Sequence, residues 1–327
     1  MGSPEVSARD SDERTGNGAP VEVRNAHRRF GDRAALQGVD LRLRRAEIYG
    51  MLGPNGAGKT TLVRAICGRL ALDSGSVRIT GADPRRDPTV RRQLGIVPQE
   101  IALYLELTVG ENLEILGRLA GVARRDLAAS VDSALRWTGL EDRRRDRVST
   151  LSGGMQRRLN IAAGTLHGPE VLLLDEPTVG VDPAAREKIH ELLRDLRDRG
   201  LAILLTTHDL EQAESLSDRI GILVNGRIRA EGSPESLVRS AFGDARELIV
   251  SLSLDPDDRG RAALQREGLT AAREDRIWTG ALDGGFESLS ELGRRLSESG
   301  LKVGEVRVRE PGLRGVFFRT AGEELDE

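Results

Sequence analysis

The chain reads Gly53-Pro54-Asn55-Gly56-Ala57-Gly58-Lys59-Thr60-Thr61 directly after a short apolar run, Ile48–Leu52. The stretch fits the phosphate-binding pattern GxxxxGK[ST], with a predicted strand before it and a predicted helix after it. Glycines let backbone amides turn toward phosphate oxygens, and a helix N-terminus adds partial positive charge. Lys59 can reach the β- and γ-phosphates, the Thr60 hydroxyl can bind Mg²⁺, and Thr61 can help to hold the α-phosphate. A glycine-rich turn without a ligand would not require the whole pattern.

A second motif, Val171-Leu172-Leu173-Leu174-Asp175-Glu176-Pro177, places two acids at the end of an apolar strand. Ligands of open α/β sheets bind at the carboxyl ends of the strands. Asp175 can hold Mg²⁺ through water, and Glu176 is the candidate that polarises an attacking water. Two acids at this position can also be an ordinary strand end, but the phosphate-binding loop favours the catalytic interpretation.

Short apolar segments alternate with helical segments around both motifs. Predicted strands cover 21–30, 35–43, 48–52, 74–80, 95–98, 171–174, 202–206, 220–224 and 227–231, and predicted helices cover 60–70, 183–199 and 210–216. This alternation predicts a parallel sheet covered by helices on both faces. A long helical pattern from 108 to 166 interrupts it as an all-helical insert, whose expected buried residues include Leu107, Leu113, Leu116 and Leu119.

The composition changes after about residue 240. The polar stretch 232–244 is expected to form a short helix and a linker. Strands at 247–254, 277–282 and 302–308, with helices at 259–267 and 289–300, predict a small α+β domain. The predicted division is therefore a disordered tail at 1–20, a main domain at 21–240 with a helical subdomain at about 100–165, and an accessory domain at 241–327.

A third motif, Leu151-Ser152-Gly153-Gly154-Met155-Gln156, opens the helix predicted from 156 to 166. A helix cap explains Ser152 but not the paired glycines, whereas exposed amides here would form a second anion site. Placed between the phosphate-binding loop and LLLDEP, the motif resembles the signature of ABC transporter ATPases. The resemblance covers about residues 21–235. It implies an α/β P-loop NTPase core with an antiparallel β subdomain and a helical insert, followed here by the small C-terminal α+β domain.

The resemblance also implies a dimer and assigns further residues. Such domains pair head to tail, with two ATP molecules held between the phosphate-binding loop of one chain and the signature of the other. Gln99 resembles the glutamine that senses Mg²⁺, Asp182 in Gly180-Val181-Asp182 resembles the acid of the loop that couples the two sites, His208 resembles the histidine at the γ-phosphate, and Phe30 sits where the family places an aromatic on adenine. Each residue type alone is usually structural, so these assignments rest on order and spacing.

The candidate site residues fall into three groups. The catalytic candidates are Glu176 and His208, and the Mg²⁺ candidates are Thr60, Gln99 and Asp175. The candidates for ATP binding are Phe30, Gly53, Pro54, Asn55, Gly56, Ala57, Gly58, Lys59, Thr60, Thr61, Gln99, Ser152, Gly153, Gly154, Asp175 and Asp182.

Composition restricts the partners and the location. The 49 basic and 52 acidic residues nearly balance, which argues against a nucleic-acid partner. Cys67 is the only cysteine, so an intrachain disulfide is impossible, and its helical spacing from Val63 and Leu70 predicts a buried small hydrophobe. No apolar run approaches the ~20 residues of a membrane helix. With the resemblance, this implies a peripheral protein held on the cytoplasmic face of the cell membrane by a separate permease.

The phrases EIYGMLGPNGAGKTT, IVPQEIALYLELTVGENL and DEPTVGVDP are most similar to ATPase subunits of daunorubicin-type multidrug and antibiotic-resistance exporters. The implied function is ATP hydrolysis that powers export of a drug, antibiotic or lipid-like molecule, by a homodimer or a pseudo-dimer. Residues 311–322 carry the group's Pro…Phe…Gly pattern, although Arg314 and Gly315 stand where members often have acids. An importer ATPase remains an alternative. So does an ATPase acting on ribosomes or DNA, which the single phosphate-binding loop and the lack of heptads disfavour.

Overall fold

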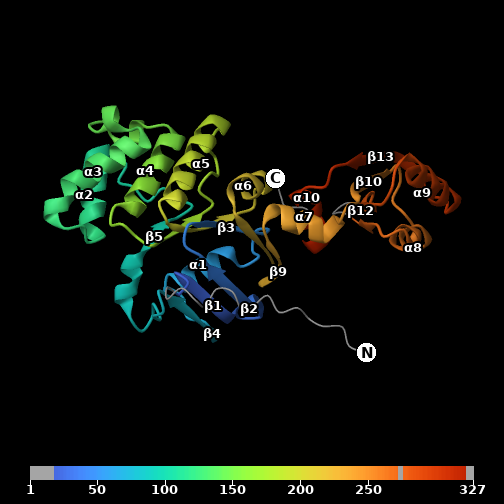
Figure 1. Ribbon diagram of the computed structural model, residues 1–327, viewed down its shortest axis with the longest axis horizontal. Coiled ribbons are helices and arrows are strands. Elements are labelled where there is room, and N and C mark those ends of the chain that lie inside the picture. The colour runs from blue at the N-terminus through green and yellow to red at the C-terminus, as the bar shows by residue number, and fades with distance from the viewer. Residues whose placement is uncertain (1–17, 272–274, 322–327) are drawn as a thin grey trace.

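The computed structural model describes residues 18–271 and 275–321 (Figure 1). Within them, a central sheet holds six strands in the order β5-β6-β7-β3-β8-β9, all parallel except the pair β8 and β9. The strands are β3 (Glu47–Leu52), β5 (Leu94–Val97), β6 (Val171–Asp175), β7 (Ala202–Thr207), β8 (Arg219–Val224) and β9 (Arg227–Gly232). The parallel sheet predicted from the apolar runs is confirmed.

A smaller antiparallel sheet of the described residues has the order β2-β1-β4. It contains β1 (Val21–Phe30), β2 (Arg33–Leu43) and β4 (Ser74–Ile79). Phe30 pairs with Arg33 across the turn predicted at Gly31-Asp32. The predicted tail falls mainly on residues 1–17, which lie outside the described residues, while the Pro20 carbonyl accepts a hydrogen bond from the Thr80 amide.

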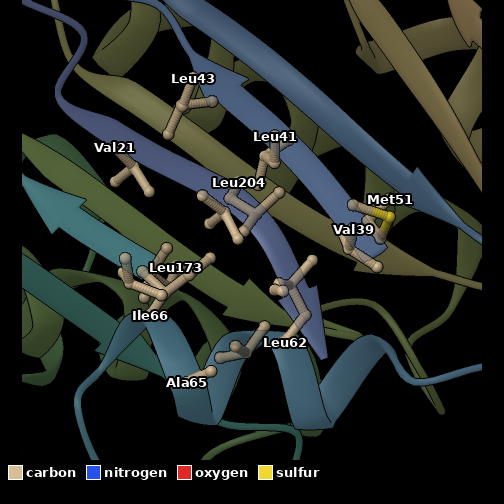
Figure 2. Close-up of a cluster of buried hydrophobic side chains, with 14 of the residues drawn as sticks. Val21, Val39, Leu41, Leu43, Met51, Leu62, Ala65, Ile66, Leu173 and Leu204 are labelled. Atoms are coloured by element: carbon tan, nitrogen blue, oxygen red, sulfur yellow. The ribbon is translucent and has the colours of Figure 1, made fainter. Parts of the chain in front are cut away.

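The central sheet is buried on both faces. Figure 2 shows one face, where Leu173 and Leu204 meet Leu62 and Ile66 of α1 (Lys59–Ile66) and side chains of the antiparallel sheet. Alternate residues of the same strands, such as Leu172 and Leu205, pack on the other face against α5 (Pro183–Asp198) and neighbouring helices. Successive strand residues point to opposite faces, so runs without polar residues suit strands covered on both sides.

Helix α1 is shorter than predicted and ends at Ile66. Gly68, with φ +67°, takes the left-handed conformation that terminates helices, so the pattern could not continue to residue 70. Cys67 is 4% exposed, as predicted, and burial raises the pKa of its thiol to about 11. The thiol is therefore protonated and packs as a small apolar group.

The insert contains α2 (Val109–Leu119), α3 (Arg124–Thr138) and α4 (Gly153–Thr165), with short 3₁₀ turns between α3 and α4. A capping box of Thr108 and Glu111 starts α2. Leu113 is fully buried, as predicted, and Leu107 and Leu116 are half-buried. The prediction for Leu119 is wrong, because its side chain is 72% exposed. Leu119 is the last residue of α2, where the helix ends.

The C-terminal module has its own antiparallel sheet and hydrophobic cluster. After α7 (Pro234–Phe242), the described strands take the order β11-β12-β10-β13, with α8 and α9 packed against the sheet. The bounds are β10 (Arg246–Leu252), α8 (Asp258–Arg266), β11 (Thr270–Ala271), β12 (Ile277–Leu282), α9 (Phe286–Glu298) and β13 (Val303–Arg309). Figure 1 shows the module at one end of the molecule.

A last helix, α10 (Leu313–Ala321), was not expected from the sequence. Leu313, Val316 and Phe317 are buried and join a cluster with Phe242 of α7 and Ile220 of the central sheet. The chain therefore leaves the main body after α7, builds the module, and returns to pack on the main body. Residues 322–327 lie outside the described residues.

Candidate nucleotide site

Three loops that follow neighbouring parallel strands form the site. The register places Asp175 of β6 beside Thr206 of β7, and Thr207 of β7 beside Leu52 of β3. The strands therefore end at one level of the sheet. The residues that follow them are Gly53, Glu176 and His208. The sheet topology thus brings together three segments that are far apart in the sequence.

Close backbone packing shapes the glycine-rich loop. Gly58 has φ +114°, and a Cβ there would lie 2.4 Å from the Ala35 carbonyl oxygen. Gly56 has φ +80° and accepts a hydrogen bond from Arg33 at 2.7 Å. Side chains rarely adopt such backbone angles, so glycine is required at both positions. The loop leads directly into α1, whose N-terminal amides suit an anion.

The Lys59 ammonium group lies inside this loop and is 6% exposed. It donates hydrogen bonds to the carbonyls of Gly53 at 2.7 Å and Pro54 at 3.3 Å. Its Nζ also lies 3.6 Å from Glu176 Oε1. Burial lowers the pKa of Lys59, and the charge of Glu176 partly offsets that shift. A buried cation at the mouth of the loop favours the approach of an anion such as a phosphate.

Glu176 lies between Lys59 and a histidine. Its Oε1 is 3.1 Å from His208 Nδ1, and the residue is 8% exposed. Glu176 has φ +48°, a conformation that costs non-glycine residues of order 1–3 kcal/mol. Its amide donates to the Thr206 carbonyl at 3.1 Å, which anchors the strained residue to β7. The structure thus brings the two predicted catalytic residues side by side, and their catalytic roles stay predictions.

The donor set beside Glu176 fits Mg²⁺. Thr60 Oγ1 lies 3.2 Å from Asp175 Oδ2, and the Thr206 hydroxyl donates to Asp175 Oδ1. Mg²⁺ prefers oxygen ligands and commonly takes one or two protein groups, with phosphate and water completing the shell. Thr60 and Asp175 offer a hydroxyl and a carboxylate oxygen at the mouth of the loop. The structure brings these two of the three predicted Mg²⁺ ligands together, and their metal-binding role stays a prediction.

Two predicted residues lie at the edge of this cluster. The Phe30 side chain is 48% exposed, and the Arg28 guanidinium carbon lies 4.8 Å from its ring centroid. Gln99 is exposed, and its backbone carbonyl is held by Arg157 at 2.7 Å. An exposed ring can stack on a base. Among the described residues, no hydrogen bond, ion pair or ring contact joins Phe30 or Gln99 to Lys59, Asp175 or Glu176.

The signature segment has two glycines with different surroundings. Ser152 caps α4 by accepting from the Met155 amide at 3.4 Å. A Cβ at Gly154 would lie 2.4 Å from Ala185 Cβ of α5, so packing within the chain requires glycine there. Gly153 is exposed, and among the described residues nothing lies within 4 Å of an added Cβ, apart from its chain neighbours and its own helix backbone. Packing within the described chain therefore does not account for a glycine at position 153.

The loop 177–182 ends with Asp182, which caps α5 by accepting from the Ala185 amide at 3.0 Å. Val179 in this loop is 44% exposed. The hydrogen bonds measured for the Ser152 and Asp182 side chains, within the part of the chain that the structure describes, go to their own helices. Neither residue is thereby linked to the phosphate-binding loop of its own chain.

Sequence reasoning missed Arg157. The residue is 4% exposed and donates to the carbonyls of Pro98 at 3.0 Å and Gln99 at 2.7 Å. Burial lowers the pKa of its guanidinium. It thus ties α4, one turn after Ser152, to the loop that carries Gln99. In a chain this rich in arginine, no sequence signal distinguishes it.

The fold and the site together define a P-loop nucleoside triphosphatase. The family model described as ABC transporter matches residues 36–179. The chain is 38% identical to the daunorubicin resistance ATP-binding protein DrrA3 of Streptomyces coeruleorubidus, over 93% of this chain and 96% of that protein. It is 38% identical to the Nod factor export ATP-binding protein I of Rhizobium etli, over 99% of this chain and 100% of that protein. The chain therefore belongs to the ABC transporter family, as an ATP-binding subunit with ATPase activity.

Solved structures agree with this assignment. One solved as the ATP-binding subunit of an ABC transporter is 31% identical and covers 67% of this chain and 92% of its own, with a TM-score of 0.61. The structure of cbiO1 from Clostridium perfringens, part of the transporter complex cbiONQ, is 28% identical, with a TM-score of 0.63 and coverage of 67% and 90%. The ABC ATPase fold predicted from the motifs is confirmed.

Proposed function

We propose that this chain hydrolyses ATP as a head-to-tail dimer and drives export through a separate permease on the cytoplasmic face of the cell membrane. The observation that carries this proposal is the position of the Glu176 carboxylate between Lys59 and His208 at the edge of the sheet. The two relatives above that are named for drug resistance and for Nod factor export support export over import. A drug, antibiotic or lipid-like substrate fits these names.

The chemistry follows from the charges in the site. A bound triphosphate competes with Glu176 for the Lys59 ammonium, because phosphate oxygens carry more charge than one carboxylate. Glu176 is then available to accept a hydrogen bond from the attacking water, and His208 orients that water or the γ-phosphate. Thr60, Asp175 and Gln99 would hold Mg²⁺, which neutralises charge on the phosphates when bound.

The second half of each site comes from the other copy. Ser152 and Gly153 present a hydroxyl and helix N-terminal amides on the surface, which suit a γ-phosphate. Gly153 has room for a side chain within its own fold, so its lack of one is explained if a nucleotide bound to the other copy approaches it closely. Asp182 and the exposed Val179 extend from the loop proposed to reach the second copy. Phe30 offers an exposed ring for the adenine.

A groove of about 500 Å³ between the helical insert and the main body is the proposed permease contact. Its lining includes Leu116, Leu119 and Arg91, and the exposed Tyr104 and Leu105 belong to the same insert. Contiguous apolar surface marks interaction sites on proteins, and Leu119, Tyr104 and Leu105 all expose apolar surface on the insert. No helix of the described residues is long and apolar enough to cross a membrane.

The proposed domain division remains 21–240 for the nucleotide-binding domain, with a helical subdomain at about 100–165, and 241–327 for the accessory domain. The separate hydrophobic cluster around Leu248, Trp278 and Leu292 supports it. Helix α10 is the part of the accessory segment that packs on the main body.

The molar mass of the Glu176→Gln variant, measured by light scattering with Mg²⁺ and ATP, tests the proposal. Loss of turnover with retained ATP should trap a dimer, whereas ADP should leave a monomer, because the nucleotide is part of the interface. A monomer at saturating ATP would contradict the dimer. Purification from cells should recover a membrane permease; recovery of ribosomes or DNA in its place would favour the non-transport alternative.

A further inference from the structure

Three fully buried polar side chains lie within or beneath the loop 177–182. Thr178 is 4% exposed, His190 of α5 is 3% exposed, and Gln212 of α6 (Leu210–Leu216) is 1% exposed. None of them belongs to the catalytic residues or to the ATP-binding residues proposed above. Burying polar groups is unfavourable unless they bond to one another, and apolar residues would fill the same space at lower cost.

Gln212 joins the other two residues. Its Nε2 donates to Thr178 Oγ1 at 2.6 Å and lies 3.4 Å from His190 Nε2. The two amide protons then serve two acceptors, so the His190 ring is neutral and accepts at Nε2. Burial lowers the pKa of His190, which agrees with a neutral ring. The side-chain amide of Gln212, on α6, therefore connects the loop after β6 with α5.

A second link runs parallel to the first. Asp209 Oδ1 accepts a hydrogen bond from the backbone amide of Gln212 at 3.0 Å. The other carboxylate oxygen, Oδ2, lies 2.9 Å from Arg186 Nη1 of α5. The Asp209 amide donates to the Thr207 hydroxyl at 3.0 Å. His208 stands between Thr207 and Asp209, so its backbone is fixed on both sides. We call the five residues of both links the polar clamp: Thr178, Arg186, His190, Asp209 and Gln212.

We propose that Gln212 is a positioning residue that, through the polar clamp, holds His208 in fixed register with the loop 177–182. His208 lies beside Glu176, while the loop is the part proposed to reach the second copy. A rearrangement around the γ-phosphate in one site therefore displaces the loop and alters the catalytic geometry of the other site. This inference rests on the proposed dimer, and it adds the physical connection between its two sites.

The clamp has a matched set of variants. Thr178→Val and Gln212→Leu remove the buried hydrogen bond and keep similar volume, while Thr178→Ser keeps the hydroxyl and serves as the control. We expect kcat to fall about tenfold or more in the first two, since displacements of about 1 Å can cost up to 10²-fold. KM for ATP should stay within about threefold, because no clamp residue is proposed to touch ATP. Thr178→Ser should retain kcat.

The double variant Thr178→Val/Gln212→Leu distinguishes a connection from two separate effects. Residues acting through one bond give a double variant no worse than the worse single variant, whereas independent effects multiply. Multiplicative losses, or a wild-type kcat in Gln212→Leu, would overturn the proposal. If the buried variants fail to fold, Arg186→Gln breaks the half-exposed second link instead, and it should lower kcat with KM unchanged; an unchanged kcat would then overturn the proposal.

Mixed dimers test the effect across the interface. Wild-type chain is combined with a large excess of Glu176→Gln chain, so each intact site faces an inactive partner. Adding Gln212→Leu to the inactive chain should lower hydrolysis in the wild-type site about tenfold, although that site is unaltered. An equal rate with and without Gln212→Leu would overturn the proposed connection. Failure of the Glu176→Gln chain to dimerise at all would instead overturn the proposed function.

Discussion

Replacing Gly153 with alanine tests whether the turn at 152–154 has a partner outside its own chain. Within the described residues, nothing beyond its chain neighbours and its own helix backbone lies within 4 Å of the added Cβ. Gly153 is the first residue of α4 and is not among the residues with positive φ. Alanine at such a site stabilises a protein by about 0.4–1 kcal/mol, because it restricts the unfolded chain. The free energy of unfolding should therefore stay the same or rise slightly.

The same methyl group should lower the rate of ATP hydrolysis by about 10²-fold. If the backbone at Gly153 approaches a nucleotide held by the second copy, a methyl group displaces that nucleotide by about 1 Å, and such displacements cost about 10²-fold in rate. ATP binding to the chain's own loop should be unchanged, because that loop lies elsewhere in the fold.

Gly154→Ala is the matched control. Its Cβ would lie 2.4 Å from Ala185 Cβ, whereas carbon atoms pack at about 3.5–4.0 Å, so α4 and α5 must separate by about 1 Å or more. Overpacking of this kind costs about 1–3 kcal/mol. Guanidinium unfolding followed by tryptophan fluorescence, together with the steady-state ATPase rate, separates the two variants. Wild-type hydrolysis by Gly153→Ala would refute the reasoning, and a loss of stability would assign Gly153 to its own fold.

Three further perturbations have defined outcomes. Lys59→Met should abolish ATP binding in a calorimetric titration, because it removes the buried ammonium from the loop; retained affinity would contradict this. Burial lowers the pKa values of His167 and His190 below 6.5, so below about pH 6.5 the unfolded chain binds more protons than the folded chain. The free energy of unfolding should therefore fall as the pH drops through that range, and it should fall less steeply in His190→Asn. Equal slopes would show that His190 does not contribute to this pH dependence. Arg157→Met removes a buried cation that has no ion-pair partner among the described residues, so the free energy of unfolding should change by only about 1 kcal/mol. Stimulation of the ATPase by the permease should be lost, because Arg157 ties α4 to the loop that carries Gln99. Unaltered stimulation would show that this arginine is only structural.

The parts of the fold that could be predicted are those that depend on short, contiguous stretches of sequence. Apolar runs such as Val171–Leu174 predicted the parallel strands, because strands covered on both faces need apolar residues at every position. The glycine-rich loop was recognisable because its backbone conformation restricts residue type at several neighbouring positions. Glu176 was singled out by its place at the end of an apolar strand, whereas His208 was assigned only through the resemblance to ABC ATPases.

The remainder depends on contacts between distant segments. Helix α10 is short, and its buried residues Leu313 and Phe317 gain their surroundings from α7 and the central sheet, so no local pattern indicated where it packs. Gln212 reads as an ordinary polar helix residue until Thr178 is seen beside it. Exposure of Leu119, the last residue of α2, depends on how far along that helix its neighbours extend. Tertiary packing decides all of these features, and local propensity does not encode it.

The most direct measurement compares ATP binding and ATP turnover in wild-type and Glu176→Gln proteins, both saturated with Mg²⁺ and ATP. Because Glu176 competes with the triphosphate for Lys59, the variant should bind ATP at least as tightly as the wild-type protein. The position of the Glu176 carboxylate predicts a turnover rate lower in the variant by about 10²-fold or more. Hydrolysis by Glu176→Gln at the wild-type rate, or absence of ATP binding by the wild-type protein, would contradict the account.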